Sequence, residues 1–421
     1  YSSARSELYK SRPFMQSAST SKPATNLSVG ERLEKSLEQL DSQLSQRSDK
    51  RKNQLLRAIF SQPAPTRKSL SQEYRLRPAT VTELVGELIE LGLVIEDRTI
   101  NPSKPGRPEV FLRVQPNALS GIVITIDSLT IYAHLINLKG EVVSSSSKTL
   151  NDHELSNQQI LNQFETLANT LIQSSPESNI VGITCSLPGL VDEDKVSWVY
   201  ANRWPEVTNL SFEPLSNNTK LPVKIAKNLN NELRARLLRH PENKKDSVLN
   251  IHWGYGIGTS YALRGQVLHT PIGGFGELGQ TSIFIGEKLV TVESVASLRA
   301  IEGELKAHVQ NVPSNEAGFE EMFNDKEITD LPVINQAIEL MSATLMNAFL
   351  VLFPQQIVIT GPFAQSPEIF KRLEQRFSEK LPKFVSREVS LHVGQRAKAD
   401  ELFGALSPLF QTEILTRLKS R

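Results

Sequence analysis

Short runs of β-branched and apolar residues alternate with helical stretches from residue 120 onward, and this alternation restricts the fold more than any other feature of the chain. The predicted strands cover residues 121–126, 131–137, 180–185, 223–225, 248–253 and 357–360. The predicted helices cover residues 155–173, 231–238, 292–308, 333–353 and 367–379. Such an order is typical of an α/β protein in which helices cover a mixed sheet.

Charge divides the chain into two unequal parts. Its 421 residues are enough for two or three domains. Residues 1–113 contain 19 Lys and Arg and 13 Asp and Glu, whereas residues 114–421 contain 28 and 33. A basic first part beside an acidic remainder indicates that the first part meets a polyanion, although a surplus of this size also fits ordinary scatter.

The low cysteine content and the lack of a long apolar stretch indicate the cellular compartment of the protein. Cys185 is the single cysteine, which excludes an internal disulfide framework and the usual cysteine-based zinc sites. The longest apolar stretch, residues 345–353, is interrupted by Asn347 and is too short to cross a bilayer. Residues 1–30 are polar and do not resemble a secretory signal. We therefore expect a soluble, cytoplasmic protein.

Residues 1–49 are expected to form a polar tail followed by an amphipathic helix. The tail is rich in Ser, Thr, Ala and Pro and has no periodicity. Leu33, Leu37, Leu40 and Leu44 then fall on one helical face. This face would either pair with another helix in a dimer or cover the next domain of its own chain.

Residues 50–113 have the pattern of a winged helix-turn-helix. Leu55 to Phe60 predict a first helix, and Thr66 is a candidate N-cap for a second. A third helix is expected to begin at Pro78, with a buried stripe that includes Val81, Leu84, Val85, Leu88 and Leu91, and to end at Gly92. Residues 93–96 and 110–113 read as the two short strands of the wing.

The exposed face of the third helix is suited to the major groove of DNA. Short polar side chains let a helix approach the bases, while arginines contact phosphates or guanine edges. The candidates on and before the helix are Arg75, Arg77, Thr80, Thr82, Glu83 and Glu87. Lys104 and Arg107, in the wing, suit a narrow minor groove. The competing interpretation is a three-helix scaffold that binds another protein.

Two glycine-rich segments and one strand end are candidate ligand sites. Gly189 ends a turn directly after the strand that closes at Cys185, where ligands gather in α/β sheets. The segment 254–258, Gly-Tyr-Gly-Ile-Gly, is either a phosphate- or sugar-binding turn or only a tight turn. The segment 273–280 holds Glu277 and Gln280 between glycines, and Glu293 follows. Such groups suit a hydroxyl-rich ligand, and the alternative is a solvated loop.

Together these segments resemble the ROK-family transcriptional regulators, the group of the NagC, Mlc and XylR repressors. The resemblance covers residues 51–409. It is carried, in order, by residues 76–82, 106–108, 187–189, 256–258, 276–279, 293–297 and 353–361. It implies a two-lobed, actin-like, sugar-kinase-like domain over residues 114–421, after the winged helix-turn-helix, and a homodimer or homotetramer.

Two departures from the family pattern weigh against catalysis. The sugar kinases have a Glu-Asn-Asp segment whose Asp is the general base, and here the matching residues are Lys227, Asn228 and Leu229. A leucine cannot accept a proton. The first phosphate loop of the kinases is represented by residues 126–130, Ile-Asp-Ser-Leu-Thr, whose side chains fill space that ATP phosphates need. We therefore expect no catalytic residue and no kinase activity.

The family's zinc site is also not expected here. Gln280 stands where the family has a zinc-binding His, and residues 286–292 replace the cysteine loop. We therefore expect neither a metal ion nor another cofactor.

The resemblance still implies a sugar site. It places Asn202, Asn228, Glu277, Gln280 and Glu293 at positions that contact the sugar in relatives. The expected protein is a homo-oligomeric transcriptional repressor of sugar genes that binds operator DNA and senses a sugar or sugar phosphate. A pocket that has drifted to another effector, or to none, is the alternative for the site. A sugar kinase with an accessory N-terminal domain and a protein-binding scaffold are the alternatives for the whole chain.

Overall fold

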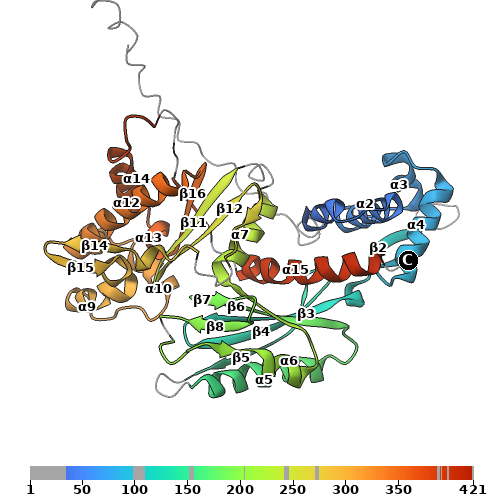
Figure 1. Ribbon diagram of the computed structural model, residues 1–421, viewed down its shortest axis with the longest axis horizontal. Coiled ribbons are helices and arrows are strands. Elements are labelled where there is room, and N and C mark those ends of the chain that lie inside the picture. Colours follow the sequence, from blue (N-terminus) through green and yellow to red (C-terminus); the bar gives the residue numbers. More distant parts are fainter. Residues whose placement is uncertain are drawn as a thin grey trace, which may run out of the picture.

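The computed structural model describes residues 35–97, 110–150, 156–202, 204–240, 246–270, 275–385, 389, 391–395 and 398–419. These residues form a small N-terminal head and two larger lobes (Figure 1). Among the described residues, no helix has the length and apolar character needed to cross a membrane.

The head has the predicted three helices and hairpin. They are α2 (Arg47–Ser61), α3 (Arg67–Glu73), α4 (Pro78–Glu90), β1 (Val94–Asp97) and β2 (Phe111–Val114), with β1 and β2 antiparallel. Thr66 caps α3 as predicted, because its hydroxyl accepts from the Ser69 N–H at 3.1 Å and the Ser69 hydroxyl accepts from the Thr66 N–H at 2.9 Å. Pro78 is the first residue of α4, and Gly92 after it has a φ of 71°.

The leucine face before the head packs on its own chain. Residues 35–38 are helical and continue into the 3₁₀ helix η1 (Gln39–Ser42). Leu37, Leu40 and Leu44 are all buried in the core of the head. Of the two interpretations of this face, the described residues show the second, a cover for the neighbouring part of the chain.

The first lobe is built on a sheet with the order β10-β6-β3-β4-β5. Its strands are β3 (Ser120–Asp127), β4 (Thr130–Asn137), β5 (Val142–Thr149), β6 (Ile180–Leu187) and β10 (Val223–Lys227). The side chains of β3 alternate between two cores, since Ile122 and Ile124 face α5 (Asn157–Ser174) and Val123 faces the opposite side. The short helices η2 (Pro116–Ala118) and α6 (Glu213–Thr219) and the small sheet of β7 (Leu190–Asp192), β8 (Ser197–Tyr200) and β9 (Leu210–Ser211) complete this lobe.

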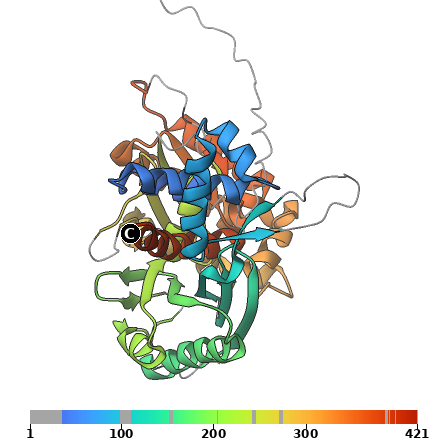
Figure 2. The same cartoon turned by 90° about the vertical axis from the view of Figure 1, so that its right-hand side faces the viewer.

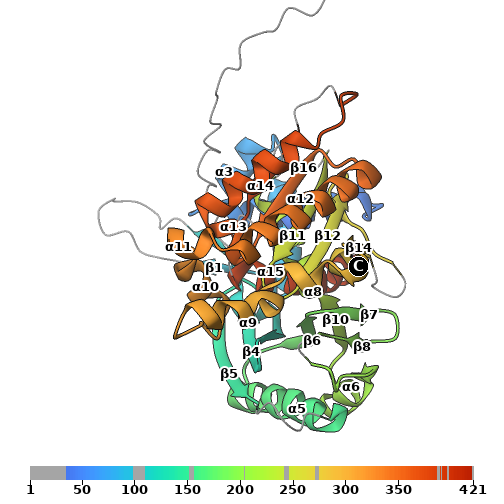
Figure 3. The same ribbon diagram turned by 90° about the vertical axis from the view of Figure 1, so that its left-hand side faces the viewer.

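The second lobe is built on a sheet with the order β13-β12-β11-β16-β17. Its strands are β11 (Ser247–Trp253), β12 (Ile257–Leu263), β13 (Gln266–Val267), β16 (Gln356–Thr360) and β17 (Leu391–Val393). The helices around it are α8 (Glu293–Ala296), α9 (Leu298–His308), α10 (Glu316–Met322), α11 (Lys326–Thr329), α12 (Pro332–Leu352), α13 (Pro362–Gln365) and α14 (Pro367–Glu379). Figure 3 shows α12 and α14 on the outer side of this sheet. A single helix over residues 292–308 was predicted, and this is wrong: Ser297 interrupts it and caps α9 by accepting from the Ala300 N–H at 3.2 Å.

Two helices join the three parts of the molecule. α7 (Asn228–Arg239) covers the inner face of the second sheet, where Leu233 and Leu237 meet Val248 and Val358. α15 (Lys398–Lys419) covers the inner face of the first sheet and packs along α7. Its far end lies beneath the head, as the view in Figure 2 shows. The core of the head therefore includes residues from the beginning and the end of the chain, among them Leu55, Leu56, Leu406, Phe410 and Ile414.

Candidate functional site

The candidate sugar residues gather where β10 passes into α7. Asn228 is the first residue of α7, and its side-chain oxygen accepts from the Leu229 N–H at 2.8 Å. Lys227, the last residue of β10, has a side chain that is 4% exposed. Its ammonium group lies 2.7 Å from Glu277 Oε1 on the second lobe. This ion pair places Glu277 next to the start of α7, across the junction of the lobes.

Glu293 connects the two glycine-rich segments. Its Oε2 accepts from the Ile257 N–H at 2.7 Å, and its Oε1 accepts from Gln280 Nε2 at 3.3 Å. A Cβ atom on Gly256 would lie 3.1 Å from Glu293 Oε2, so the glycine lets the carboxylate approach the backbone. Burial raises the pKa of Glu293, and so does the nearby charge of Glu277, while the Ile257 N–H opposes the shift. The result is a carboxyl group held rigidly by its neighbours.

Asn202 reaches the same site from the first lobe through Arg299. The Arg299 guanidinium donates to the Asn202 carbonyl at 2.8 Å, and its charge also acts on Glu293. The Asn202 side-chain oxygen and the Tyr200 hydroxyl are hydrogen-bonded to each other. These contacts thus bring all five candidate residues into one region, where hydrogen-bond donors and acceptors are concentrated. Their role in binding a sugar stays a prediction.

Two cationic residues of this region were missed by sequence reasoning. Lys227 stands in the segment that corresponds to the kinases' Glu-Asn-Asp, and that exchange of a Glu for a Lys was a usable signal. Arg299 carries no local signal, because its partner Asn202 is 97 positions away in the chain. Both residues bridge the lobes, and only the folded structure shows these contacts.

Leu229, the residue that the family resemblance matches to the kinase base, has an apolar side chain. Leu229 is 4% exposed, and its Cδ1 lies 2.8 Å from where a Cβ on Gly258 would be. Its carbonyl accepts from the Ser260 hydroxyl at 3.0 Å. The counterpart of the first phosphate loop is the tight turn between β3 and β4, in which Ser128 has a φ of 56°. Leu129 of that turn packs against the core of the first lobe.

The segment that matches the family's zinc loop forms a hairpin. β14 (Ser282–Ile285) pairs in antiparallel fashion with β15 (Lys288–Thr291). Gln280 precedes it in the 3₁₀ helix η4 (Leu278–Gln280). Within the described part of the chain, no group of three or more His, Cys, Asp or Glu is arranged to hold a metal ion.

A buried polar network joins this site to α15. The Asn231 side chain donates to the Ser186 hydroxyl at 2.9 Å, and that hydroxyl donates to Glu401 Oε1 at 2.7 Å. Arg234 donates to Asn231 Oδ1 at 2.6 Å. One strand end and two helices are thereby linked one turn after Asn228. A shift at the start of α7 would therefore be transmitted to α15 through hydrogen bonds as well as through apolar packing.

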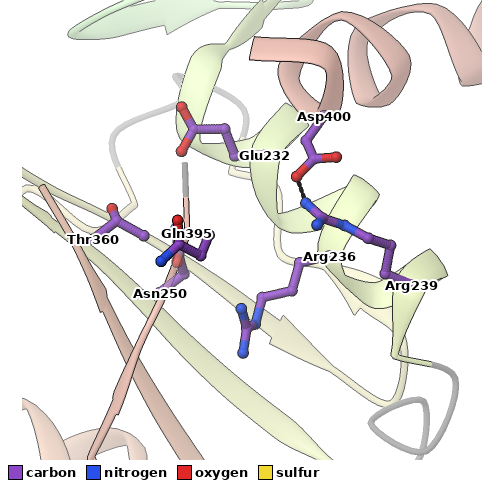
Figure 4. Close-up of a pocket in the computed structure, with 7 residues that line it drawn as sticks. All are labelled: Glu232, Arg236, Arg239, Asn250, Thr360, Gln395 and Asp400. Carbon is purple, nitrogen blue, oxygen red and sulfur yellow. Dashed lines mark ion pairs between the residues drawn. The ribbon is translucent and has the colours of Figure 1, made fainter. Parts of the chain in front are cut away.

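Farther along α7, charged groups surround a small cavity of about 20 Å³, which is room for about one water molecule. Figure 4 shows its lining residues, Glu232, Arg236, Arg239, Asn250, Thr360, Gln395 and Asp400. Arg239 of α7 and Asp400 of α15 form an ion pair there. The cavity contains none of the five candidate sugar residues, and we interpret its ion pair as part of the junction between the two helices.

In the head, the described members of the predicted DNA-facing set lie on α4 and in the turn before it. Arg75, Arg77, Thr82 and Glu83 are exposed and Thr80 is partly exposed. The Thr82 hydroxyl donates to the Pro78 carbonyl at 2.9 Å. Glu87 was predicted to lie on this face, and this is wrong. Its Oε2 lies 3.1 Å from the buried Lys52 ammonium. Lys104 and Arg107 lie outside the described residues.

The fold and the site together define a two-lobed protein of the sugar-kinase-like, actin-like class that carries a winged helix-turn-helix head. The chain belongs to the ROK family, whose sequence profile matches residues 129–411. The predicted family and fold class are thereby confirmed.

Relatives and a solved structure agree with this assignment. The chain is 26% identical over 313 residues to a putative xylose repressor of Caldicellulosiruptor sp. (strain Rt8B.4), covering 70% of this chain and 74% of that protein. It is 27% identical over 298 residues to the xylose repressor of Caldicellulosiruptor bescii, covering 68% and 72%. The crystal structure of a ROK-family transcriptional regulator, a homologue of the E. coli Mlc protein, superposes with a TM-score of 0.67 at 23% identity, covering 88% of this chain and 98% of that chain.

Proposed function

We propose that this protein is a cytoplasmic transcriptional repressor of sugar uptake or metabolism genes. Its head binds double-stranded operator DNA, and its two lobes sense a sugar or sugar phosphate without phosphorylating it. Two relatives are named xylose repressors, which supports regulation of sugar genes. The outward face of α4, with Arg75 and Arg77 exposed before it, supports binding in the major groove.

The observation that carries the proposal is that α15 belongs to both the effector lobes and the head. Near its start, α15 packs on α7, whose first residue is the candidate ligand residue Asn228. Near its end, Arg417 donates to the Leu91 carbonyl at 3.2 Å, and the Leu418 carbonyl accepts from Lys52 at 3.3 Å. α15 thus has one end beside the candidate ligand region and the other beneath the helices of the head.

The proposed mechanism follows from this arrangement. A homodimer or homotetramer presents two heads to an operator of approximate two-fold symmetry. A ligand between the lobes changes their closure, α7 and α15 move together, and the spacing of the heads changes. Such coupling between two sites typically amounts to about 1–3 kcal/mol.

The presence of Leu229 supports a sensing role for the two lobes and argues against an enzymatic one. No proton can be taken from a sugar hydroxyl by this side chain, and the turn at Ser128 and Leu129 has side chains where a phosphate loop needs bare backbone. A coupled assay with ATP and a panel of hexoses is expected to show no turnover. Steady nucleotide consumption that depends on a hexose would contradict this part of the proposal.

Genomic footprinting of the purified protein tests the central claim. We expect a small number of protected palindromic sites near genes for sugar transport or breakdown, and release of these sites by one sugar or sugar phosphate. The matched variant is Arg77→Ala, which should keep the fold and protect the same sites only at a higher protein concentration. Protection of no genomic fragment would refute the proposed function and favour a protein-binding scaffold.

A further inference from the structure

A cavity lies between the head and the first lobe, away from the candidate sugar residues. Its volume of about 390 Å³ is in the range of sites that hold small organic molecules. The head lines it with the end of α2, the residues that follow and β2, and the first lobe lines it with the turn between β4 and β5. None of the five candidate sugar residues is among its lining residues. A molecule in this cavity therefore contacts the head and the first lobe at once.

The wall of the cavity on the side of the head is apolar. Ile59 and Phe60 lie near the end of α2, and Leu112 and Val114 point to the same side of β2, because strand residues two apart share a face. Ile59, Leu112 and Val114 are buried in the core of the head, whereas Phe60 is partly exposed. The Phe60 ring and its aliphatic neighbours thus offer a surface on which another ring can pack.

The wall on the side of the first lobe is a turn of fixed shape. The oxygen of the buried Asn137 side chain accepts from the N–H groups of Lys139 and Glu141 at 3.0 and 3.1 Å. The Asn137 amide also donates to Glu141 Oε2 at 2.8 Å, and Gly140 has a φ of 77°. This wall is therefore already organised, and it needs little rearrangement when a ligand binds.

The charged groups of the lining favour an anion. Arg113 and Lys139 stand against a single acid, Glu141, whose carboxylate already has the Asn137 amide as a donor. Arg113 is paired through its Nε with Asp97 of β1. The Lys139 ammonium has no ion-pair partner among the described residues. A cation of this kind beside an apolar wall suits a carboxylate that is joined to an apolar body.

We propose that this cavity is a second ligand site, which takes a small aromatic carboxylic acid. The ring of the acid packs on Phe60 and its aliphatic neighbours, and the carboxylate accepts from the Lys139 ammonium. Because the bound acid contacts both walls, it holds the head in one position on the first lobe. The site lies outside the candidate sugar site, and its occupation does not depend on whether a sugar binds.

The test measures binding of aromatic acids to the full-length protein by isothermal titration calorimetry. The probes are benzoate, cinnamate and 4-hydroxycinnamate, with cinnamamide as the neutral counterpart of cinnamate. We expect one acid to bind per chain, and we expect cinnamate to bind about fivefold or more tightly than cinnamamide. Binding of none of the three acids, or equal binding of cinnamate and its amide, would overturn the inference. Footprinting reports separately on the proposed function.

Two variants and a matched control locate the site. Lys139→Met keeps most of the side-chain stem and removes the charge, so it should weaken cinnamate binding about fivefold or more. Lys148→Met removes an exposed charge from β5 of the same lobe and should leave cinnamate binding unchanged. Phe60→Leu keeps an apolar side chain without the ring and should weaken cinnamate binding as well. Cinnamate binding by a folded Lys139→Met protein as tight as that of the wild type would show that the acid is held elsewhere, and Lys139→Gln repeats this test if the Met variant does not fold.

Discussion

Gly404 of α15 lies directly against the backbone of Asn231 on α7, and a Cβ atom at this glycine would overlap the Asn231 carbonyl oxygen. Both residues are buried, and the neighbours of Gly404 in this contact are backbone atoms, which cannot rotate away. The absence of a side chain at residue 404 thus sets the distance between the two helices that join the lobes. Asn231 also holds the Ser186 hydroxyl, so the same point fixes the polar network of the junction.

Replacing this glycine should separate the two helices. For Gly404→Ala we expect a loss of about 2–4 kcal/mol in the free energy of unfolding, because overpacking forces the backbone to move. Gly303→Ala in α9 is the matched control, since no atom lies within 4 Å of a Cβ placed there and alanine favours a helix. Urea unfolding measures both. Equal stability of Gly404→Ala and the wild type would show that the helices do not need this close approach.

The buried Lys52 connects α2 of the head to α4 and α15. Its ammonium lies 2.9 Å from Asp49 and 3.1 Å from Glu87, and it donates to the Leu418 carbonyl of α15 at 3.3 Å. Burial alone would lower the pKa of Lys52, but its hydrogen bonds to the two carboxylates outweigh this and raise the pKa. The lysine is therefore charged, and the two acids depend on it.

Removal of that charge should destabilise the head. Lys52→Met leaves the buried Asp49 carboxylate without its cation and removes the partner of the partly exposed Glu87, and we expect a cost of about 3–5 kcal/mol. The exposed Lys50 on the same helix provides the control, because Lys50→Met should stay within about 0.5 kcal/mol of the wild type. Hydrogen exchange of the α2 amides, measured beside urea unfolding, locates the effect. A Lys52→Met protein as stable as its Lys50→Met counterpart would show that the pairs contribute nothing.

Arg77, which is exposed just before α4, should contribute to operator affinity mainly by contacting a phosphate. Arg77→Ala is expected to weaken binding at moderate salt and to reduce the slope of log affinity against log salt by about 1. Lys371→Ala removes an exposed positive charge from α14, far from the head, and should leave the slope unchanged. Fluorescence anisotropy over a salt series supplies the measurement. If both variants changed the slope equally, the effect would be one of net charge and not of contact.

Glu193, in the turn between β7 and β8, should make the stability of the protein depend on pH. Burial raises the pKa of Glu193 to about 7, with Asp194 adding to the shift and Arg234 opposing it. His269 of the second lobe lies 3.5 Å from it, and burial followed by the charge of Arg234 lowers the pKa of this histidine. The folded state therefore holds the carboxyl proton more tightly than the unfolded chain does. This stabilisation is complete below the unfolded pKa and is lost as the pH rises through about 7.

The corresponding variant is Glu193→Gln, whose side chain stays neutral. Between about pH 5 and about pH 8 the wild type should lose about 1–3 kcal/mol relative to this variant. Urea midpoints at several pH values give the comparison. Parallel curves for the two proteins would mean that Glu193 does not titrate in this range.

The sequence predicted most elements of the fold whose pattern is local. Thr66, Pro78 and Gly92 carry their own capping and stop signals, and α14 has the bounds expected from its alternating apolar residues. α15 was missed, because it is buried on most of its circumference and has Pro408 in its interior, so it shows neither a clear apolar face nor an uninterrupted helical run. The strands β5, β12 and β14 were missed as well, since their residues are partly polar and owe their conformation to pairing partners.

The residues of the candidate site also divide into those with a local sequence pattern and those that depend on distant contacts. Residues in glycine-rich or family-like segments, such as Glu277 and Glu293, were named as candidates from their local pattern. The contacts that give them their geometry join distant positions, as Lys227 with Glu277 and Arg299 with Asn202 do. Periodicity and composition carry no information on such pairs. Glu87 was misplaced for a related reason, because only the folded head shows that Lys52 draws it inward.

The sharing of one core by α2 and α15 also bears on how the protein is made. The head is encoded early, yet Leu406, Phe410 and Ile414, which complete its interior, leave the ribosome some three hundred residues later. A chain that stops before α15 would hold α2, α3 and α4 without this part of their core, and we expect such a fragment to stay incompletely folded.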